Sequence, residues 1–306
     1  MSTYVIRRLI FSLFVLWGAL TIVFLAVRAI PGDPALMMLG TDATAQEVQA
    51  LREKLGLDRP LIVQYAGYVI QALALDLGDS LRLQQPVVGA VAERLPTTGR
   101  LALAAMLLAV VVSFPLGIAA ALRPGSIIDS IVSVVSLLGQ SIPAFWVGIM
   151  FILIFARQLR LLPSGGDETW AHLILPAVTV ALPLVGVLTR LVRSGLLDVL
   201  YEDYIRTARA KGLPAGAVMR RHALRNMLIP VITVIGLQLG HLLGGAVITE
   251  TVFAWPGVGL LLVDAITNRD YPLIQAAILF ITAIFIAINF LVDLSYGALD
   301  PRIRVQ

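Results

Sequence analysis

A basic stretch carries the strongest chemical signal in this chain. Arg190 to Arg225 holds 8 of the 23 Lys and Arg residues and only three acids, and long apolar runs border it on both sides. Cations gathered between two membrane spans indicate a cytoplasmic loop that a soluble partner recognises. Because the chain has no energy-coupling motif of its own, we expect that partner to supply the work.

Motifs for other chemistry are absent from the sequence. There is no G-x-x-x-x-G-K-[ST] loop to hold nucleotide phosphates and no G-x-S-x-G serine nucleophile. His172, His222 and His241 are scattered and the chain has no cysteine, so we expect no metal site and no cofactor on this chain. Membrane topology explains the net charge of +4, and nucleic acid is not an expected partner.

Five polar side chains fall inside otherwise apolar runs. In hydrocarbon such groups face protein or a water-filled path, so they are candidates for lining a translocation path or for hydrogen bonds between helices. None has an acidic partner in its own span, which argues against a proton-relay pump. Glu250 and Asp264 flank the following outer loop, where we expect exposed interfacial positions. The five residues are Gln140, Ser141, Gln238, His241 and Asn289.

Composition indicates a membrane protein embedded in lipid. Charged residues make up 14% of the chain, against about 25% in soluble domains, and the mean hydropathy is +0.90. Runs of this length suit helices rather than barrel strands, so we expect an all-α protein with six transmembrane helices. The six predicted spans are Leu9–Val27, Leu101–Leu122, Ile131–Ala156, Leu173–Thr189, Met227–Thr249 and Pro272–Val292.

The first span has features of a secretory signal, because Arg7 and Arg8 precede it. Its largely apolar run of 19 residues exceeds the usual h-region of about 7 to 15, and no small-x-small cleavage site follows. We therefore interpret it as a retained helix.

Charge asymmetry orients the six spans. Arg7, Arg8, Arg123, the basic loop 190–226, Arg302 and Arg304 all fall on one side, which the positive-inside rule makes cytoplasmic together with both termini. The predicted division is an N-terminal segment with the first span (1–30), an extracytoplasmic segment (31–96) and a transmembrane core (97–306). The protein is expected in the inner (cytoplasmic) membrane as a multi-pass protein.

The outer segment has two helix candidates. Thr44 to Leu55 begins with a capping-box pattern, Thr44 followed by Glu47, and Gln64 to Leu75 is a second short apolar helix. The segment is either a structured linker or a docking cap for something delivered from outside. Disulfides cannot hold it together because the chain has no cysteine, so packing must.

Glycine and proline carry the packing information within the spans. Gly236, Gly240 and Gly244 recur every four residues, which lets a neighbouring backbone approach one helix face, either inside the chain or at a subunit or pore-lining surface. Each proline inside a span frees a carbonyl and can kink its helix. These prolines are Pro115, Pro143, Pro176 and Pro183.

The basic stretch contains a helical pattern of its own. Arg206 and Arg209 turn away from an apolar stripe, and Gly212 with Pro214 ends the helix. Such a helix can lodge in a groove of a partner with its cations on the rim; a solvated loop or a helix on the lipid surface is the alternative. The stripe consists of Leu197, Tyr201, Tyr204, Ile205 and Ala208.

Five motifs in order resemble the permeases of binding-protein-dependent ABC importers. They most resemble the dipeptide, oligopeptide and nickel branch, which includes glutathione permeases. The motifs are PGDP (31–34), YIRTARAKG (204–212), HALRN (222–226), GGAVITETVFAWPGVG (244–259) and ALDPRIR (298–304).

The resemblance implies a type I importer permease that works by alternating access. The 204–212 segment would be the coupling helix, formed by Tyr204, Arg206, Thr207, Ala208, Arg209, Lys211 and Gly212. Arg206 replaces the glutamate that opens the wider family's loop motif, so a salt bridge from that position to the ATPase is not expected. The resemblance still implies that the helix docks on the ATPase by its shape. The implied partners are a second homologous permease, two ATP-binding subunits carrying ATP and Mg, an extracytoplasmic solute-binding protein and membrane lipid.

Two other functions are weighed against this one. A membrane scaffold or assembly subunit without a substrate path is the alternative, and gene neighbours would discriminate it from an importer. A stand-alone secondary transporter lacks the intramembrane acids and internal repeats expected of such folds. The sequence does not identify the cargo, because dipeptides, oligopeptides, glutathione and nickel chelates all fit.

Overall fold

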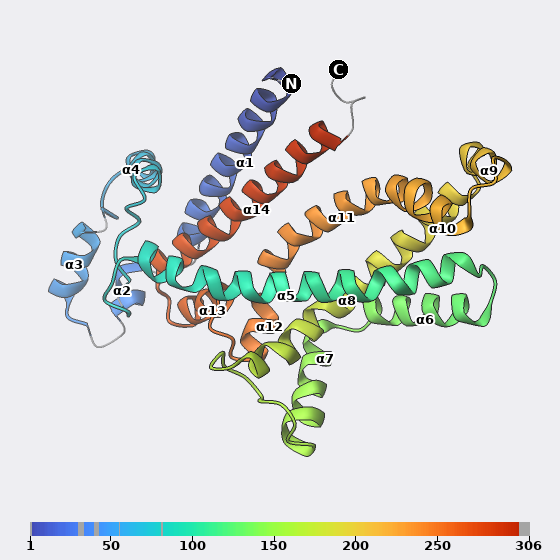
Figure 1. Cartoon of the computed structure of the whole chain (residues 1–306). Helices are drawn as coiled ribbons and strands as arrows, with labels where there is room; N and C mark the ends of the chain where they lie inside the picture. The colour runs from blue at the N-terminus through green and yellow to red at the C-terminus, as the bar shows by residue number, and fades with distance from the viewer. Residues whose placement is uncertain (1, 30–33, 40–42, 55, 81, 300–306) are drawn as a thin grey trace. The chain divides into compact units, whose positions relative to one another are not determined.

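The computed structural model describes residues 2–29, 34–39, 43–54, 56–80 and 82–299. All regular secondary-structure elements in these ranges are helices, and one isolated β-bridge joins Asp79 to Pro86. Two motifs of the sequence, 31–34 and 298–304, lie largely outside the described residues. The helices are α1 (Ser2–Ala29), α2 (Pro34–Leu39), α3 (Ala45–Lys54), α4 (Leu61–Leu73), α5 (Val87–Leu122), α6 (Ile127–Ser141), α7 (Ala144–Phe151), η1 (Ile152–Gln158), α8 (Trp170–Leu200), α9 (Asp203–Ala210), α10 (Ala215–Val218), η2 (Met219–Ala223), α11 (Leu224–Gly245), α12 (Val247–Val252), α13 (Val258–Thr267) and α14 (Tyr271–Leu299) (Figure 1).

Four helices of the described chain are long and apolar enough to cross a membrane, and two bent pairs raise the number to six. The single spans are Val5–Ala29, Val87–Leu122, Trp170–Leu200 and Tyr271–Leu294. The bent pairs are Ile127–Ser141 with Ala144–Gln158, and Ala215–Leu228 with Pro230–Leu242. The predicted all-α membrane protein is therefore confirmed, with six spans when each bent pair counts as one.

Pro143 divides the third predicted span into two helices. Ile142 has φ −83° and ψ 128°, an extended conformation, because a residue that precedes proline is pushed out of the helical region. The two pieces meet at 96°. A continuous helix over Ile131–Ala156 is thus wrong, whereas the expected kink at Pro143 is confirmed. Pro176 and Pro183 lie inside the unbroken helix α8.

Helix α8 extends beyond the fourth predicted span, which ended at Thr189. Leu188, Val192 and Leu196 recur every four residues and are fully buried, so one face keeps packing after the first arginines appear. The first part of the 190–226 stretch is therefore helix. The hydropathy pattern predicted the end of the span at the first charged residues. The helix continues beyond them because one of its faces remains buried.

The chain divides into two compact units, residues 1–99 with 243–290, and residues 100–242 with 291–306. In the first unit, α1 and α14 run side by side (Figure 1), and Phe24 and Val27 pack in one apolar core with Leu273 and Ala277. The start of α5 and helices α4 and α13 complete that core.

In the second unit, glycines let helices approach closely. A Cβ atom at Gly186 of α8 would lie 2.3 Å from the Ser136 carbonyl oxygen of α6, and one at Gly117 of α5 would lie 2.7 Å from the Val192 Cβ. Real Cβ atoms do not reach such distances, so glycine is required at both crossings. Of the predicted glycine stripe, Gly236 packs against Val292, since a Cβ there would lie 2.4 Å from its Cγ2, and Gly244 has open space. Gly240 is buried.

The capping box predicted at Thr44 is confirmed. The Thr44 backbone N–H donates to Glu47 Oε2 at 2.8 Å, and the Glu47 N–H donates to Thr44 Oγ1 at 3.3 Å. Each side chain thus accepts a hydrogen bond from the other residue's backbone N–H at the start of α3. The second predicted outer helix forms as α4, three residues earlier than its predicted start at Gln64.

Candidate functional site

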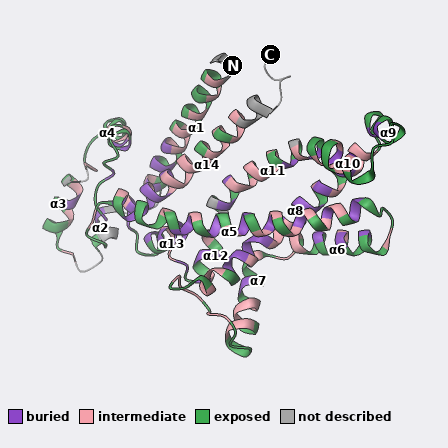
Figure 2. Ribbon diagram, viewed as in Figure 1, coloured by how far each residue is buried: buried purple, intermediate pink, exposed green. Residues whose placement is uncertain are grey.

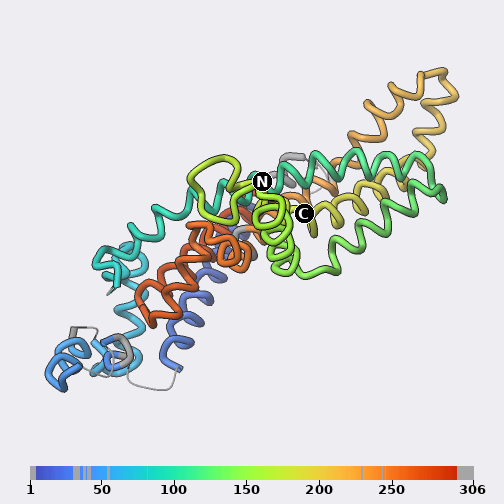
Figure 3. The backbone as a smooth tube through the Cα atoms, turned by 90° about the horizontal axis from the view of Figure 1, so that it is seen from below, coloured from blue at the N-terminus to red at the C-terminus, as the bar shows by residue number. Residues whose placement is uncertain are grey.

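Helix α9 begins where α8 ends and forms a separate short helix. Glu202 takes an extended conformation, φ −69° and ψ 146°, which breaks the helical path after Leu200. Asp203 lies in the first turn of α9 and Arg209 in the last, the arrangement that the helix dipole favours. In both views α9 projects at one end of the second unit (Figures 1 and 3).

Two residues anchor α9 to the second unit. Ile205 and Ala208 are buried in an apolar cluster with Leu196 of α8 and with Val218 and Met227 from the helices that follow. The Asn226 amide donates to the Tyr204 hydroxyl at 2.8 Å and adds a polar link to α11. The short helix is therefore fixed in position by contacts on one face.

The opposite face of α9 is exposed and cationic. Arg206, Thr207, Arg209 and Lys211 all lie at the surface, as the green outer surface of α9 shows (Figure 2). The Arg206 Nη2 lies 3.4 Å from Asp203 Oδ1, an exposed pair that contributes little stability. This face is free to meet a partner, as the sequence predicted for Arg206 and Arg209.

The predicted apolar stripe is wrong at Tyr201 and Tyr204, which are 73% and 40% exposed. The break at Glu202 separates α8 from α9, so the 3.6-residue period does not continue across it. Leu197 belongs to α8, and only Ile205 and Ala208 form the buried face of α9.

Gly212 ends α9 in a Schellman motif. Its φ is +79°, its N–H donates to the Arg209 carbonyl at 2.9 Å, and the Leu213 N–H donates to the Ala208 carbonyl at 3.3 Å. A Cβ atom at Gly212 would meet nothing within 4 Å. Glycine is required here for its backbone conformation and not for space.

A groove of about 390 Å³ runs under α9 in the second unit. Leu197, Leu200 and Met219 supply apolar walls, and Arg206 and Arg209 of α9 also line it. A shape-matched partner could insert an apolar side chain here and meet cations at the rim.

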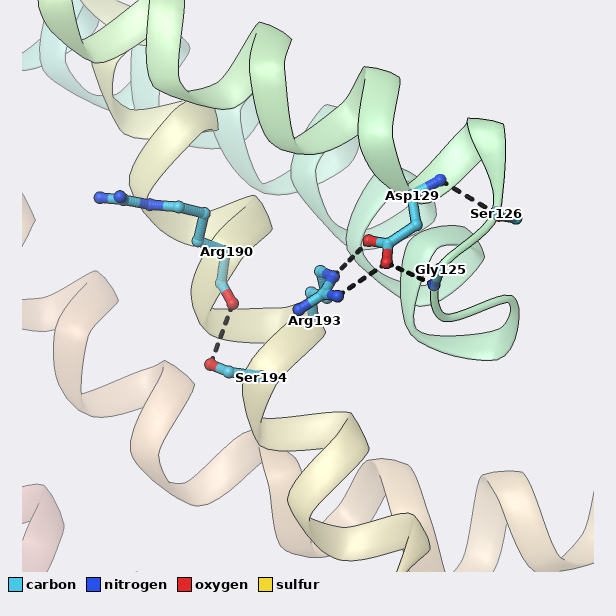
Figure 4. Close-up of polar contacts among 6 residues, drawn as sticks. All are labelled: Gly125, Ser126, Asp129, Arg190, Arg193 and Ser194. Carbon is cyan, nitrogen blue, oxygen red and sulfur yellow. Dashed lines mark hydrogen bonds and ion pairs between the residues drawn. The ribbon is translucent and has the colours of Figure 1, made fainter.

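An ion pair that the sequence analysis missed joins α6 to α8. The Arg193 guanidinium donates two hydrogen bonds to the Asp129 carboxylate, one of them from Nη2 to Oδ2 at 2.7 Å (Figure 4). The Gly125 N–H also donates to Oδ2 at 3.0 Å, and Ser126 caps the Asp129 N–H. A sequence signal existed, since Ser126-x-x-Asp129 is a capping pattern at a helix start.

Of the five predicted path residues, Gln140 makes the most informative contact. Its Oε1 accepts a hydrogen bond from Arg190 Nη2 at 2.5 Å, and its Nε2 donates to the Ser136 carbonyl at 3.0 Å. Ser141 instead bonds to the Leu137 carbonyl of its own helix. Arg190 extends away from the neighbouring Asp129–Arg193 pair (Figure 4).

The remaining path candidates belong to two different units. Gln238 is half-buried and His241 is exposed on the same stretch of α11 in the second unit, whereas Asn289 lies on α14 in the first. Asn289 Oδ1 is buried with no hydrogen-bond partner in the described part of the chain. A role in translocation stays a prediction for all five.

Glu250 is buried, which corrects the expectation that it is exposed. Its Oε1 accepts from the Thr98 hydroxyl at 2.7 Å, and its Oε2 accepts from the N–H groups of Gly259 at 2.7 Å and Leu260 at 3.1 Å. The carboxylate thus caps the start of α13, where the helix dipole favours negative charge. Burial raises the pKa of Glu250 above its usual value, and these hydrogen bonds oppose that rise. Asp264 is exposed, as expected.

Comparison with known sequences gives the family. Residues 113–305 match the family described as binding-protein-dependent transport system inner membrane component, and residues 1–102 match that family's N-terminal counterpart. The chain is a member of this permease family. Glutathione transport system permease proteins GsiC from Escherichia coli O6:H1 and Salmonella typhi are each 43% identical to it over 306 residues, all of both chains.

A solved structure supports the fold of this permease. The inward-facing methionine ABC transporter MetNI has a TM-score of 0.55 and 19% identity, over 69% of this chain and 96% of that one. The permease is thus a multi-pass inner membrane subunit of an ABC importer, and ATP hydrolysis takes place on separate subunits. Such importers combine permease, ATPase and solute-binding protein.

Proposed function

We propose that this permease imports peptides, of the dipeptide, oligopeptide or glutathione type, and forms half of the translocation path with a second homologous permease. Full-length similarity to glutathione permeases supports this cargo class. Two ATP-binding subunits bind ATP and Mg, an extracytoplasmic binding protein delivers the cargo, and both termini of the permease are cytoplasmic. The 1–30, 31–96 and 97–306 division is part of the same proposal.

Helix α9 carries the coupling in this proposal. Ile205 and Ala208 join it to the core of the second unit, and Arg206 and Arg209 lie on its exposed face beside the 390 Å³ groove. An ATP-binding subunit that holds the exposed face would move the buried face with it. Closure of the ATPases would then reach α8 and α11, and alternate the access of the path.

A cross-linking experiment tests this docking surface. The chain has no cysteine, so Arg206→Cys introduces a single reactive thiol at the exposed face of α9. With a short thiol-to-amine cross-linker in membrane vesicles, we expect a covalent product with an ATP-binding subunit. Asp264→Cys is the matched control, because Asp264 is also exposed and lies on the opposite side in the proposed topology. Cross-linking from position 264 but not from 206 would contradict the proposal.

A further inference from the structure

A polar cavity of about 400 Å³ lies in the first unit, at the C-terminal end of α1 and against α4 and the start of α14. Its volume is in the range of small-molecule sites, roughly 300–1,000 Å³. None of the site residues discussed above belongs to it. The side chains that matter for its chemistry are Arg28, Glu53, Arg59, Gln71 and Gln275.

Gln64 holds the cavity wall in a fixed shape. Its Oε1 accepts a hydrogen bond from Arg28 Nε at 3.0 Å, and its Nε2 donates to the carbonyls of Leu57 at 3.2 Å and Arg59 at 2.7 Å. The Arg28 guanidinium also lies 3.6 Å from the centre of the Phe24 ring. The loop that carries Arg59 is thereby tied to α1 and α4, as a preformed site requires.

Tyr68 forms part of the cavity wall but offers no binding group. The residue is 7% exposed, and its hydroxyl is buried, with no hydrogen-bond partner among the described residues. Burial raises the pKa of Tyr68 to about 12, so the hydroxyl keeps its proton. Because the hydroxyl is itself buried, the groups that can bind a ligand are the other polar side chains of the lining.

The other polar groups that matter in the cavity are one cationic side chain, one anionic side chain and two amide side chains. Arg59 has no acidic partner in the described part of the chain, and Glu53 Oε1 accepts only from Gln49, at 2.8 Å within its own helix. Gln71 and Gln275 each present an amide that can both donate and accept. A guanidinium, a carboxylate and two amides together complement a carboxylate, an ammonium and peptide bonds.

We propose that this cavity binds a short zwitterionic peptide. Arg59 binds the peptide carboxylate together with Arg28, which lines the same cavity, and Glu53 binds its ammonium group. Gln71 and Gln275 bond to the peptide backbone. The choice of a peptide rests on the proposed function, whereas the requirement for both charged ends comes from the cavity itself.

Binding of trialanine to the purified permease complex tests the site. The complex is placed in nanodiscs of phosphatidylcholine without binding protein, and binding is measured by calorimetry. Glu53→Gln and Arg59→Gln should each weaken trialanine binding roughly tenfold or more. Asp58→Asn is the matched control and should bind as the wild type does, because Asp58 is an exposed acid on the same loop that does not line the cavity.

Trialanine with an acetylated amino end and an amidated carboxyl end should not bind. Equal binding of this blocked peptide, or unchanged binding in Arg59→Gln, would overturn the inference. So would displacement of trialanine by phosphatidylglycerol in the nanodisc, which would assign the cavity to a lipid headgroup. Uptake with the binding protein present is measured separately: uptake without binding at the cavity refutes only this site, and binding without uptake refutes only the proposed function.

Discussion

Valine at position 212 is expected to reduce peptide uptake at least about tenfold while ATP hydrolysis continues. Gly212 ends α9 with φ +79°, and a β-branched residue in that conformation costs roughly 1–2 kcal/mol, about a factor of ten in the population of the turn. Nothing else blocks the change, since a Cβ there meets no atom within 4 Å. The variant should therefore insert and assemble but present α9 in the wrong orientation.

Gly216→Val provides the matched control for this experiment. Gly216 also has open space around its Cβ position, but it lies inside the short helix α10 and its φ is not positive. Uptake and ATPase activity are measured together in membrane vesicles for both variants. Normal uptake in Gly212→Val, or an equal loss in Gly216→Val, would refute the role of the α9 exit turn in coupling.

Glu250→Ala is expected to abolish the folded permease. The substitution removes the acceptor for the Thr98 hydroxyl and for the N–H groups of Gly259 and Leu260, all in the core of the first unit. The Thr98 and Gly259 donors are buried and the Leu260 N–H is partly buried. An unsatisfied buried donor costs about 1–3 kcal/mol, so the combined loss is a large part of the stability of a domain. The carboxylate also fills the space beside Gly257 and Gly259, so its removal leaves a void there.

Thermal melting in detergent and the yield of purified protein measure this effect. Glu250→Gln keeps one carbonyl acceptor and should fall between Glu250→Ala and the wild type. Asp264→Ala, at an exposed acid nearby in sequence, should melt as the wild type does. A Glu250→Ala protein with wild-type yield and melting temperature would show that the buried network contributes little.

Local patterns in the sequence predicted the local features of the fold. The Thr44–Glu47 capping box and the helix stop at Gly212 depend on residues within a few positions of each other, and both formed as expected. Apolar runs of about 20 residues located the spans, because hydropathy averages over one helix crossing. The bend at Pro143 was also expected, although its 96° angle was not.

Contacts between distant segments could not be predicted in the same way. Asp129 and Arg193 are 64 residues apart, and each alone resembles an ordinary charge near the end of a span. Glu250 looked interfacial because it follows an apolar run, yet Thr98, 152 residues away, meets it in the core. Tyr201 matched a helical stripe, but the extended conformation of Glu202 interrupts it.

ATP-driven uptake by the reconstituted complex tests the central claim most directly. The tagged permease is purified from membranes with its bound proteins, and the complex is placed in liposomes containing ATP and Mg. Labelled glutathione or a short peptide is then supplied outside with the loaded binding protein. We expect recovery of a second permease and two ATP-binding subunits, and accumulation of cargo that requires both ATP and the binding protein. Recovery of this chain without an ATPase, or hydrolysis without any cargo accumulation, would contradict the account.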